Sequence, residues 1–469
     1  MQLYHYRSIP SALLELGNGT FHFAAREELN DPIEGYVQVF WQGDWAAWEG
    51  LLRNYICSLS QAMELYLLDG DADMLQHRSL VVDLHGFDHA PLGAVWQELG
   101  EAFLADEALQ KLTVCYGEHE LKVYEEELQL LLFLLHRKAM VLCVRKGLEC
   151  GMLTEKEPAQ QLLELFGRES RQELSFALPE EVLGLQEQRA QIARLLKDTI
   201  EDIREQQYMR LGLEDEAFLY GQRAEQGAQE ALQASEAHRR RKWLSIAVDF
   251  PRVYVEQLKE MIYPASYVVC FSRRSDDSAM WGNYAANHQG VCLIYETGED
   301  NRLELTDCNQ RFSLEAKPVA YGGELIERNF FETFGRLTEA QIRTWLTGSE
   351  GRSRYYARIL ENPKWRQRYW EAFDAKTYRK LPAWSHEEEY RLAIADTLYR
   401  YEDPMSRNLA FDPQALKGII WGIRTSEYDR LRILAALQKR GIEPGTLTFY
   451  QAEYDGGAQQ IRVRKKGMR

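Results

Sequence analysis

The spacing of apolar residues divides the chain into three segments. Over residues 1–37 apolar and polar positions alternate, as they do in strands that bury one face. From 38 to 248 the apolar residues recur every three or four positions, which predicts a large, mainly helical insertion. Alternation returns over 249–469, apart from a helical excursion at 324–378. Because strands are predicted near both ends of the sequence, we expect an α+β protein whose mixed sheet is assembled from the two ends.

Individual elements follow from the same pattern. In the first segment, strands are expected at 3–7 and 20–24, joined by a short helix that Ser11 caps. Residues 186–238, rich in Glu, Gln, Arg and Ala, are expected to form long packed helices. Further short strands are predicted in the insertion and in the third segment, at 79–84, 112–124, 267–271, 290–295, 318–321, 389–394, 418–421 and 446–450.

The charge of the chain argues against a general affinity for nucleic acids. Its 469 residues carry a formal net charge of −16, whereas nonspecific binding of phosphates depends on Lys and Arg. Two basic runs, 238–242 and 462–469, are interpreted as like-charge segments that face water. A nucleic-acid-processing enzyme would need the first run beside its functional site, and the overall acidity disfavours that hypothesis.

The cysteine pattern predicts a cytoplasmic protein. The seven cysteines include no CxxC pair, and no charged-then-apolar leader follows Met1. The most apolar stretches, 130–135 and 139–144, are too short to span a bilayer and are separated by charged residues. We therefore expect a reducing compartment and no membrane segment.

Several common catalytic motifs are absent from the sequence. It contains neither HExxH nor a Cys/His cluster with zinc spacing, so no metal site is predicted. It also lacks a Walker loop, a GxGxxG fingerprint and a GxSxG elbow. Classical NTPase and Rossmann functions therefore lose their main support, whereas a catalytic Ser/His/Asp set stays open.

The densest run of polar and aromatic residues lies at 270–292. A strand ending at Ser272 leads through a loop into a predicted helix, on which Trp281, Tyr284 and His288 are spaced by three and four. One helix face would then present two aromatic rings and an imidazole to a ligand. In the alternative interpretation, the two rings pack on the sheet and the imidazole hydrogen-bonds neighbouring backbone.

A second candidate lies at the start of the strand predicted at 389–394. Alternation places Glu387, Glu389 and Arg391 on one face of that strand. A carboxylate pair beside an arginine can hold the hydroxyls of a sugar. The alternative is that the three charges simply meet water.

These segments resemble a bacterial family known as domain of unknown function 2971. The resemblance covers residues 1–35 and the chain from 265 onward, whereas the insertion is unusually long for that family. The matching positions are 3–8, 21–24, 28–35, 270–272, 280–285, His288, Gly290, Cys292, Trp384, Glu387, 389–391 and 418–422.

The order of the segments also resembles, more remotely, the ADP-ribosyltransferase superfamily. There, a His or Arg lies on the first strand, an aromatic second strand follows, and a Glu lies on a late strand. The resemblance implies an ADP-ribosyltransferase-like sheet and NAD as a substrate. Breaking the nicotinamide–ribose bond develops positive charge on the sugar, which a carboxylate beneath the ring stabilises.

Site residues follow from this resemblance. It implies that Glu389 is the catalytic carboxylate and that Glu387 contacts an acceptor. It further implies that His5 hydrogen-bonds a ribose hydroxyl and that Phe21 or Phe23 stacks on nicotinamide.

A second set of residues is implied by other branches of that superfamily. These use Arg, Ser and Glu in chain order, which here are Arg7, Ser272 and Glu389. The chain departs from the His-type branch because Phe21 and Phe23 occupy the second strand, where that branch has a Tyr. The missing hydroxyl puts the chemistry of the His-type set in doubt.

Two functional hypotheses remain from the sequence. The first is an NAD-consuming transferase or glycohydrolase, acting as a toxin or an anti-phage effector. The second is a non-catalytic sensor of a small nucleotide ligand, in which Trp281, Tyr284, His288 and Glu389 line the binding site. In either case the helical insertion is a candidate surface for a protein partner.

Overall fold

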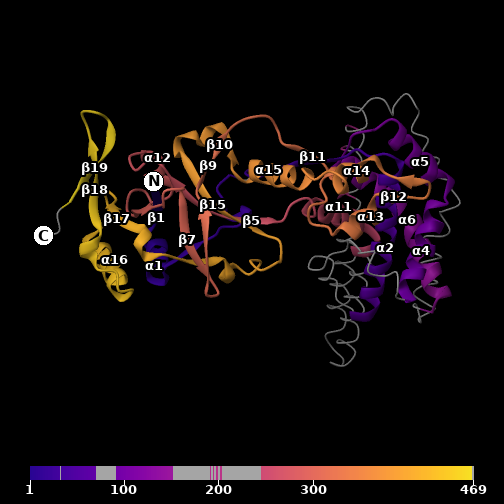
Figure 1. The fold of residues 1–469 in the computed structure, drawn as a ribbon, viewed down its shortest axis with the longest axis horizontal. Helices are drawn as coiled ribbons and strands as arrows, with labels where there is room; N and C mark the ends of the chain where they lie inside the picture. Colours follow the sequence, from indigo (N-terminus) through magenta and orange to yellow (C-terminus); the bar gives the residue numbers. More distant parts are fainter. Residues whose placement is uncertain are drawn as a thin grey trace, which may run out of the picture. The chain divides into compact units, whose positions relative to one another are not determined.

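Two compact units make up the part of the chain that the computed structural model describes (Figure 1). The described residues are 1–31, 33–69, 91–151 and 245–466, together with isolated positions between 191 and 202. Unit 1 comprises Met1–Val37, Pro264–Ile326 and Trp370–Arg469, and unit 2 comprises Gln38–Tyr263 and Glu327–Tyr369.

The units differ in composition from the predicted segments. Residues 327–369, expected within the helical excursion of the third segment, belong to unit 2 together with the insertion. The strand predicted at 79–84, the basic run 238–242 and most of the helical stretch 186–238 lie outside the described residues.

Unit 1 is built on an eight-stranded mixed sheet in the order β19-β18-β17-β6-β1-β5-β15-β9. Neighbouring strands are antiparallel, except for the parallel pair β17 and β18. β1 lies between two strands from the distant third segment, so the prediction of an α+β protein with a mixed sheet is confirmed. The strands are β1 (Gln2–Arg7), β5 (Ala265–Ser272), β6 (Val291–Glu296), β9 (Lys317–Pro318), β15 (Glu389–Asp396), β17 (Leu416–Trp421), β18 (Thr448–Asp455) and β19 (Gln460–Lys465).

A second, four-stranded sheet in unit 1 has the order β2-β16-β7-β8. β5 connects the two sheets: its Ser272 pairs with Tyr4 of β1, whereas its Val268 pairs with Ala24, just beyond β2. The strands of this sheet are β2 (Thr20–His22), β7 (Arg302–Asp307), β8 (Gln310–Glu315) and β16 (Asn408–Phe411).

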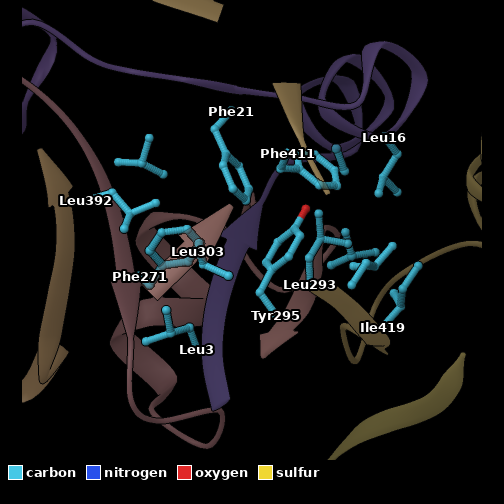
Figure 2. Packing of buried hydrophobic residues seen from close by; sticks show 14 of the residues in the cluster. Leu3, Leu16, Phe21, Phe271, Leu293, Tyr295, Leu303, Leu392, Phe411 and Ile419 are labelled. Atoms are coloured by element: carbon cyan, nitrogen blue, oxygen red, sulfur yellow. The ribbon is translucent and has the colours of Figure 1, made fainter. Parts of the chain in front are cut away.

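The main core of unit 1 draws residues from both sheets (Figure 2). Phe21 of β2 stacks on Phe411 of β16, with ring centroids 4.6 Å apart, and meets Tyr295 of β6 edge-on at 4.9 Å. Leu3 and Phe271 of the large sheet belong to the same cluster. We call the side of the large sheet that bears them the core face.

The opposite side of the large sheet carries a smaller apolar cluster. Tyr6 and Cys292 lie there, together with the short helix α12 (Ser278–Asn283). Trp281 of α12 is fully buried, meets Tyr6 edge-on and donates its indole N–H to the carbonyl of Ser275. Because side chains alternate along a strand, residues on this side of β1 are the even-numbered ones.

Helix α1 (Ile9–Asn18) follows β1 directly. Ser8, not Ser11, is its N-cap, and its hydroxyl accepts a hydrogen bond from the Ser11 amide. Gly19 ends the helix at φ 64°, a left-handed conformation that favours glycine. The predicted helix, from Ser11 through Leu16, was therefore too short at both ends. Its Glu15 is buried in the core.

Unit 2 is mainly helical, and α2, α4, α5 and α6 lie together in it (Figure 1). The strand predicted at 112–124 is wrong over most of its length, because α5 continues to Glu118 and only β4 (Val123–Tyr124) is extended. Tyr116 of α5 packs against Trp48 of α2, so tertiary contacts override the local strand preference. Among the described residues of unit 2, the helices include α2 (Trp45–Asp69), α4 (Pro91–Leu104), α5 (Glu107–Glu118), α6 (Glu125–Glu149), α11 (Phe250–Glu260), α13 (Glu339–Trp345) and α14 (Arg354–Leu360).

None of the helices within the described ranges has the length and apolar character needed to cross a bilayer.

Candidate functional site

Cross-strand register brings one candidate set together in unit 1. Glu389 of β15 pairs with Ser272 of β5, and Ser272 pairs with Tyr4 of β1. Arg391 pairs with Cys270 in the same way. Paired residues point to the same side of a sheet, so these side chains share the side opposite to the core face.

An ion pair with two contacts anchors this set. Arg391 donates its Nε hydrogen to Glu389 Oε1 at 2.6 Å and an Nη2 hydrogen to Glu389 Oε2 at 3.1 Å. Its Nη2 also forms an ion pair with Glu34, and its Nη1 donates to the carbonyl of Thr377 at 2.7 Å. The planar guanidinium thus links a strand carboxylate to one from the N-terminal segment.

Lys380 provides the second positive charge. It lies on β14 (Arg379–Lys380), which pairs with β10 (Ala320–Tyr321). Its Nζ donates to Glu387 at 2.6 Å and to Glu389 at 3.1 Å, and lies 3.8 Å from Glu34. We call these five ionic residues the charge cluster: Glu34, Lys380, Glu387, Glu389 and Arg391.

The turn before β15 places Glu387 in this cluster. Glu387 ends a 3-10 helix (Pro382–Glu387), and Glu388 then adopts φ 41° before the strand begins. Tyr284 donates its hydroxyl hydrogen to Glu387 Oε1 at 2.6 Å, and Tyr321 accepts the backbone N–H of Glu389 at 2.7 Å. The Tyr284 hydroxyl therefore binds a carboxylate of the cluster, whereas the Tyr321 hydroxyl satisfies the backbone amide at the start of the strand.

The environment shifts the pKa values of two carboxylates of the cluster in opposite directions. Although burial opposes ionisation, Arg391 and Lys380 lower the pKa of Glu389 to about 2. Burial raises the pKa of Glu34 to about 7, despite the opposing effect of Arg391. At neutral pH the cluster therefore favours an ionised Glu389, beside a Glu34 whose pKa is raised towards neutrality.

The interpretation that the charges of this strand face water is wrong. Glu387, Glu389 and Arg391 are 2%, 4% and 2% exposed. Burial of charge is costly even when it is paired, so stability alone does not account for such a cluster. Strongly perturbed ionisable groups of this kind are instead typical of functional sites.

His5 and Arg7 lie on the other side of the sheet, at the core face. Both contact Glu15: His5 Nδ1 lies 3.1 Å from its Oε1, and Arg7 donates its Nε hydrogen to Oε2 at 2.7 Å. Tyr295 donates to Glu15 as well, at 2.7 Å. This group of side chains is satisfied within the core and does not meet Glu389.

The two phenylalanines proposed to stack on nicotinamide are also at the core face. Phe21 and Phe23 are fully buried in the main core. Neither implied set of residues is therefore assembled in this structure, because His5, Arg7 and both phenylalanines are separated from Glu389 by the sheet.

The shared helix face expected for Trp281, Tyr284 and His288 is not formed. α12 ends at Asn283, and residues 286–288 have positive φ angles of 48°, 52° and 67°. A right-handed helix cannot continue through such residues. Trp281 packs on the sheet, Tyr284 reaches the charge cluster, and the His288 amide donates to the Trp281 carbonyl at 3.1 Å.

Ser272 contributes to the site by holding its backbone. Its hydroxyl donates to the Glu387 carbonyl at 2.6 Å and accepts the Arg274 amide at 3.0 Å. Ser272 is 1% exposed, and its hydroxyl hydrogen is used within the protein. The residue therefore stabilises the turn before Glu389 and does not donate to a ligand.

Sequence reasoning assigned no role to Glu34, Lys380 or Tyr321. Glu34 lies within the matching stretch 28–35, which was the one available signal for it. Lys380 and Tyr321 are held by a two-stranded pairing whose partners are nearly sixty positions apart, and no local pattern indicates it.

No group of three or more His, Cys, Asp or Glu side chains in the described ranges is arranged to hold a metal ion. The charge cluster contains two cations of its own, which would compete with a metal for the carboxylates.

Glu34 gives unit 1 a predicted dependence on pH. Its folded pKa of about 7 is above the ordinary value of 4.5, so its contribution to stability is complete below pH 4.5 and is lost as the pH rises through 7. Between pH 5 and pH 8, we expect the melting temperature of wild type to fall relative to that of Glu34→Gln. Circular dichroism measures both melting temperatures. A constant difference would contradict the assigned protonation.

Comparison with known proteins gives one family match. No curated protein matches the chain significantly, and no solved structure does. Residues 280–392, which include Tyr284, Lys380, Glu387, Glu389 and Arg391, match the model of the family described as "Protein of unknown function (DUF2971)".

Proposed function

We propose that unit 1 is an NAD-consuming, ADP-ribosyltransferase-like enzyme whose reaction takes place at the charge cluster. The observation that carries the proposal is the fixed, ionised carboxylate of Glu389, with Glu387 beside it and a common lysine between them. The order of the segments along the chain supports the same chemistry.

In this reaction the bond between the nicotinamide nitrogen and the ribose carbon breaks. The bonding electrons leave with nicotinamide, and the sugar becomes an oxocarbenium ion that the negative charge of Glu389 stabilises. A hydroxyl or amine of the acceptor, or water, then forms the new bond to the same carbon and loses a proton. Glu387 lies next to Glu389 and is the residue assigned to receive that proton.

The proposed enzyme differs from both sets of residues that the sequence implied. Four residues of those sets have no part in it because they lie at the core face: His5, Arg7, Phe21 and Phe23. Lys380 and Tyr284 replace them as the polar neighbours of the two glutamates.

The second candidate is a site that binds a nucleotide without cleaving it. It is favoured by the contacts of Glu389, because Arg391 and Lys380 already occupy both of its carboxylate oxygens. In that case unit 1 would be a ligand sensor, acting as a toxin or defence component only through a partner of unit 2.

Release of nicotinamide from NAD by the purified chain tests the two candidates. We expect wild type to release nicotinamide and Glu389→Gln to lose at least about a hundredfold in rate, since one stabilising charge is removed. The neighbouring Glu388→Gln is the matched control, because Glu388 is exposed, and its rate should stay within about twofold.

Two outcomes would contradict the catalytic role of Glu389. Equal loss in both variants would show that the turn, and not the carboxylate, is needed. Binding of NAD by wild type without any release of nicotinamide would favour the sensor.

A further inference from the structure

Asp31 and the turn at residues 33–35 contribute two buried carboxylates to the same site. Asp31 and Glu34 are 2% and 3% exposed, although they lie in neither a helix nor a strand. The Glu34 amide donates to the Asp31 carbonyl at 3.0 Å, and Gly35 has φ 68°, so the backbone closes a tight turn. The turn thereby directs two acidic side chains inward from a loop.

The carboxylates of Glu34 and Asp31 differ in their ion-pair and hydrogen-bond partners. Glu34 forms ion pairs with Arg391 and Lys380. Asp31 Oδ1 accepts the Ile33 amide at 3.0 Å, but Asp31 Oδ2 has no hydrogen-bond partner among the described residues. A buried carboxylate oxygen without a donor is costly, so a ligand that donates a hydrogen bond at this oxygen would be favoured.

Asp31 lies at the charge cluster. Its negative charge acts on Glu34, as does that of Glu389. The preceding residue, Asn30, is exposed and interacts with the hydroxyl of Tyr284, which also donates to Glu387. The unpartnered oxygen therefore belongs to the same neighbourhood as the two glutamates of the proposed reaction.

The donor that fits this oxygen is a sugar hydroxyl. An acidic side chain that accepts from a ribose hydroxyl is a common means of recognising nucleotides, because one carboxylate can bind one or both hydroxyls of the diol. A phosphate is excluded as the partner of Asp31, since it brings negative charge to a cluster in which carboxylates already outnumber cations.

We propose that Asp31 is a specificity-determining residue that accepts a hydrogen bond from a hydroxyl of the ribose held at the charge cluster, and that Glu34 positions it. This inference rests on the proposed function, because it assumes that a ribose of a dinucleotide is bound there. It adds a second residue of the N-terminal segment, beside Glu34, to a site whose other residues lie between 272 and 391.

Calorimetric binding to the full-length chain tests the inference without turnover. The probes are ADP-ribose and two analogues in which the terminal ribose lacks the 2- or the 3-hydroxyl. We expect wild type to bind at least one analogue about tenfold more weakly than ADP-ribose, the effect of one hydrogen bond to a charged group. In Asp31→Asn the side-chain oxygen keeps the hydrogen bond from the Ile33 amide, and the NH2 group, a donor, takes the place of Oδ2. The variant should therefore bind all three ligands within about twofold of one another.

Glu27→Gln is the matched control for the variant, since Glu27 is exposed on the same segment and the substitution removes the same charge. It should retain the discrimination of wild type. The comparison of ligands on wild type alone keeps the inference testable if Asp31→Asn fails to fold.

The failures are distinguishable. If wild type binds the three ligands equally, or if Asp31→Asn weakens all three by the same factor, then the role of Asp31 is overturned while a nucleotide site remains. If wild type binds none of them, the proposed function is overturned and this inference with it.

Discussion

Arg391→Met is expected to lower the free energy of unfolding of unit 1 by about 3–5 kcal/mol, the usual cost of removing one partner from a buried ion pair. The substitution leaves Glu389 and Glu34 buried without their guanidinium and leaves the Thr377 carbonyl without its donor. Methionine retains an unbranched apolar stem like that of arginine, so the main loss is the guanidinium group. Urea unfolding followed by circular dichroism measures the change.

A surface arginine provides the comparison for Arg391. Arg432 pairs with Asp429 at 3.1 Å on α16 (Glu427–Lys439), and its side chain is 44% exposed. Arg432→Met should change the free energy of unfolding by less than about 1 kcal/mol, as is usual for exposed pairs. A similarly small effect at Arg391 would mean that water reaches the charge cluster. The burial of its five ionic residues would then no longer support a functional role for the cluster.

Phe21→Ala is expected to destabilise unit 1 by about 3–5 kcal/mol, through lost burial and the cavity that remains. The ring is fully buried and contacts Phe411, Tyr295 and Phe271. Because these neighbours come from both sheets, the cavity cannot close without moving one sheet against the other. Thermal and urea unfolding provide the measurement.

This substitution also separates the two roles considered for Phe21. A residue that stacks on nicotinamide would lose ligand affinity with little change in stability, whereas a core residue shows the reverse. Tyr454→Ala is the control for loss of an aromatic ring, because Tyr454 on β18 is 65% exposed. Its effect on stability should be below about 1 kcal/mol. Retained stability with lost affinity in Phe21→Ala would restore the stacking role.

The large sheet could be predicted because its strands carry their own signal. The alternation in β1 and the apolar run in β6 are local patterns, and both strands form where they were expected. The prediction failed at α5, where Thr113, Val114 and Tyr116 favour a strand locally. Packing of that helix against α2 decides its structure, and a single sequence does not show such packing.

The candidate site was predictable only in part, for the same reason. The spacing of Glu387, Glu389 and Arg391 placed three charges together, and the structure brings them into one cluster. Their partners Glu34 and Lys380 arrive from elements that no local pattern links to β15. The assignment of His5 depended on which side of β1 faces Glu389. That choice follows from the register Tyr4–Ser272–Glu389, which the sequence alone does not supply.

The position of β1 between β5 and β6 has a consequence for synthesis on the ribosome. Tyr6 of β1 hydrogen-bonds the Arg274 carbonyl, 268 positions later in the chain. At about 5–20 residues per second, that partner emerges on the order of 13–50 s after β1 does. During this interval the apolar side chains of β1 and β2 have no sheet to join. We therefore expect a chaperone near the exit tunnel to bind β1 and β2 during this interval. Helices α2, α4, α5 and α6, which follow β2 in the chain, can already fold at that stage.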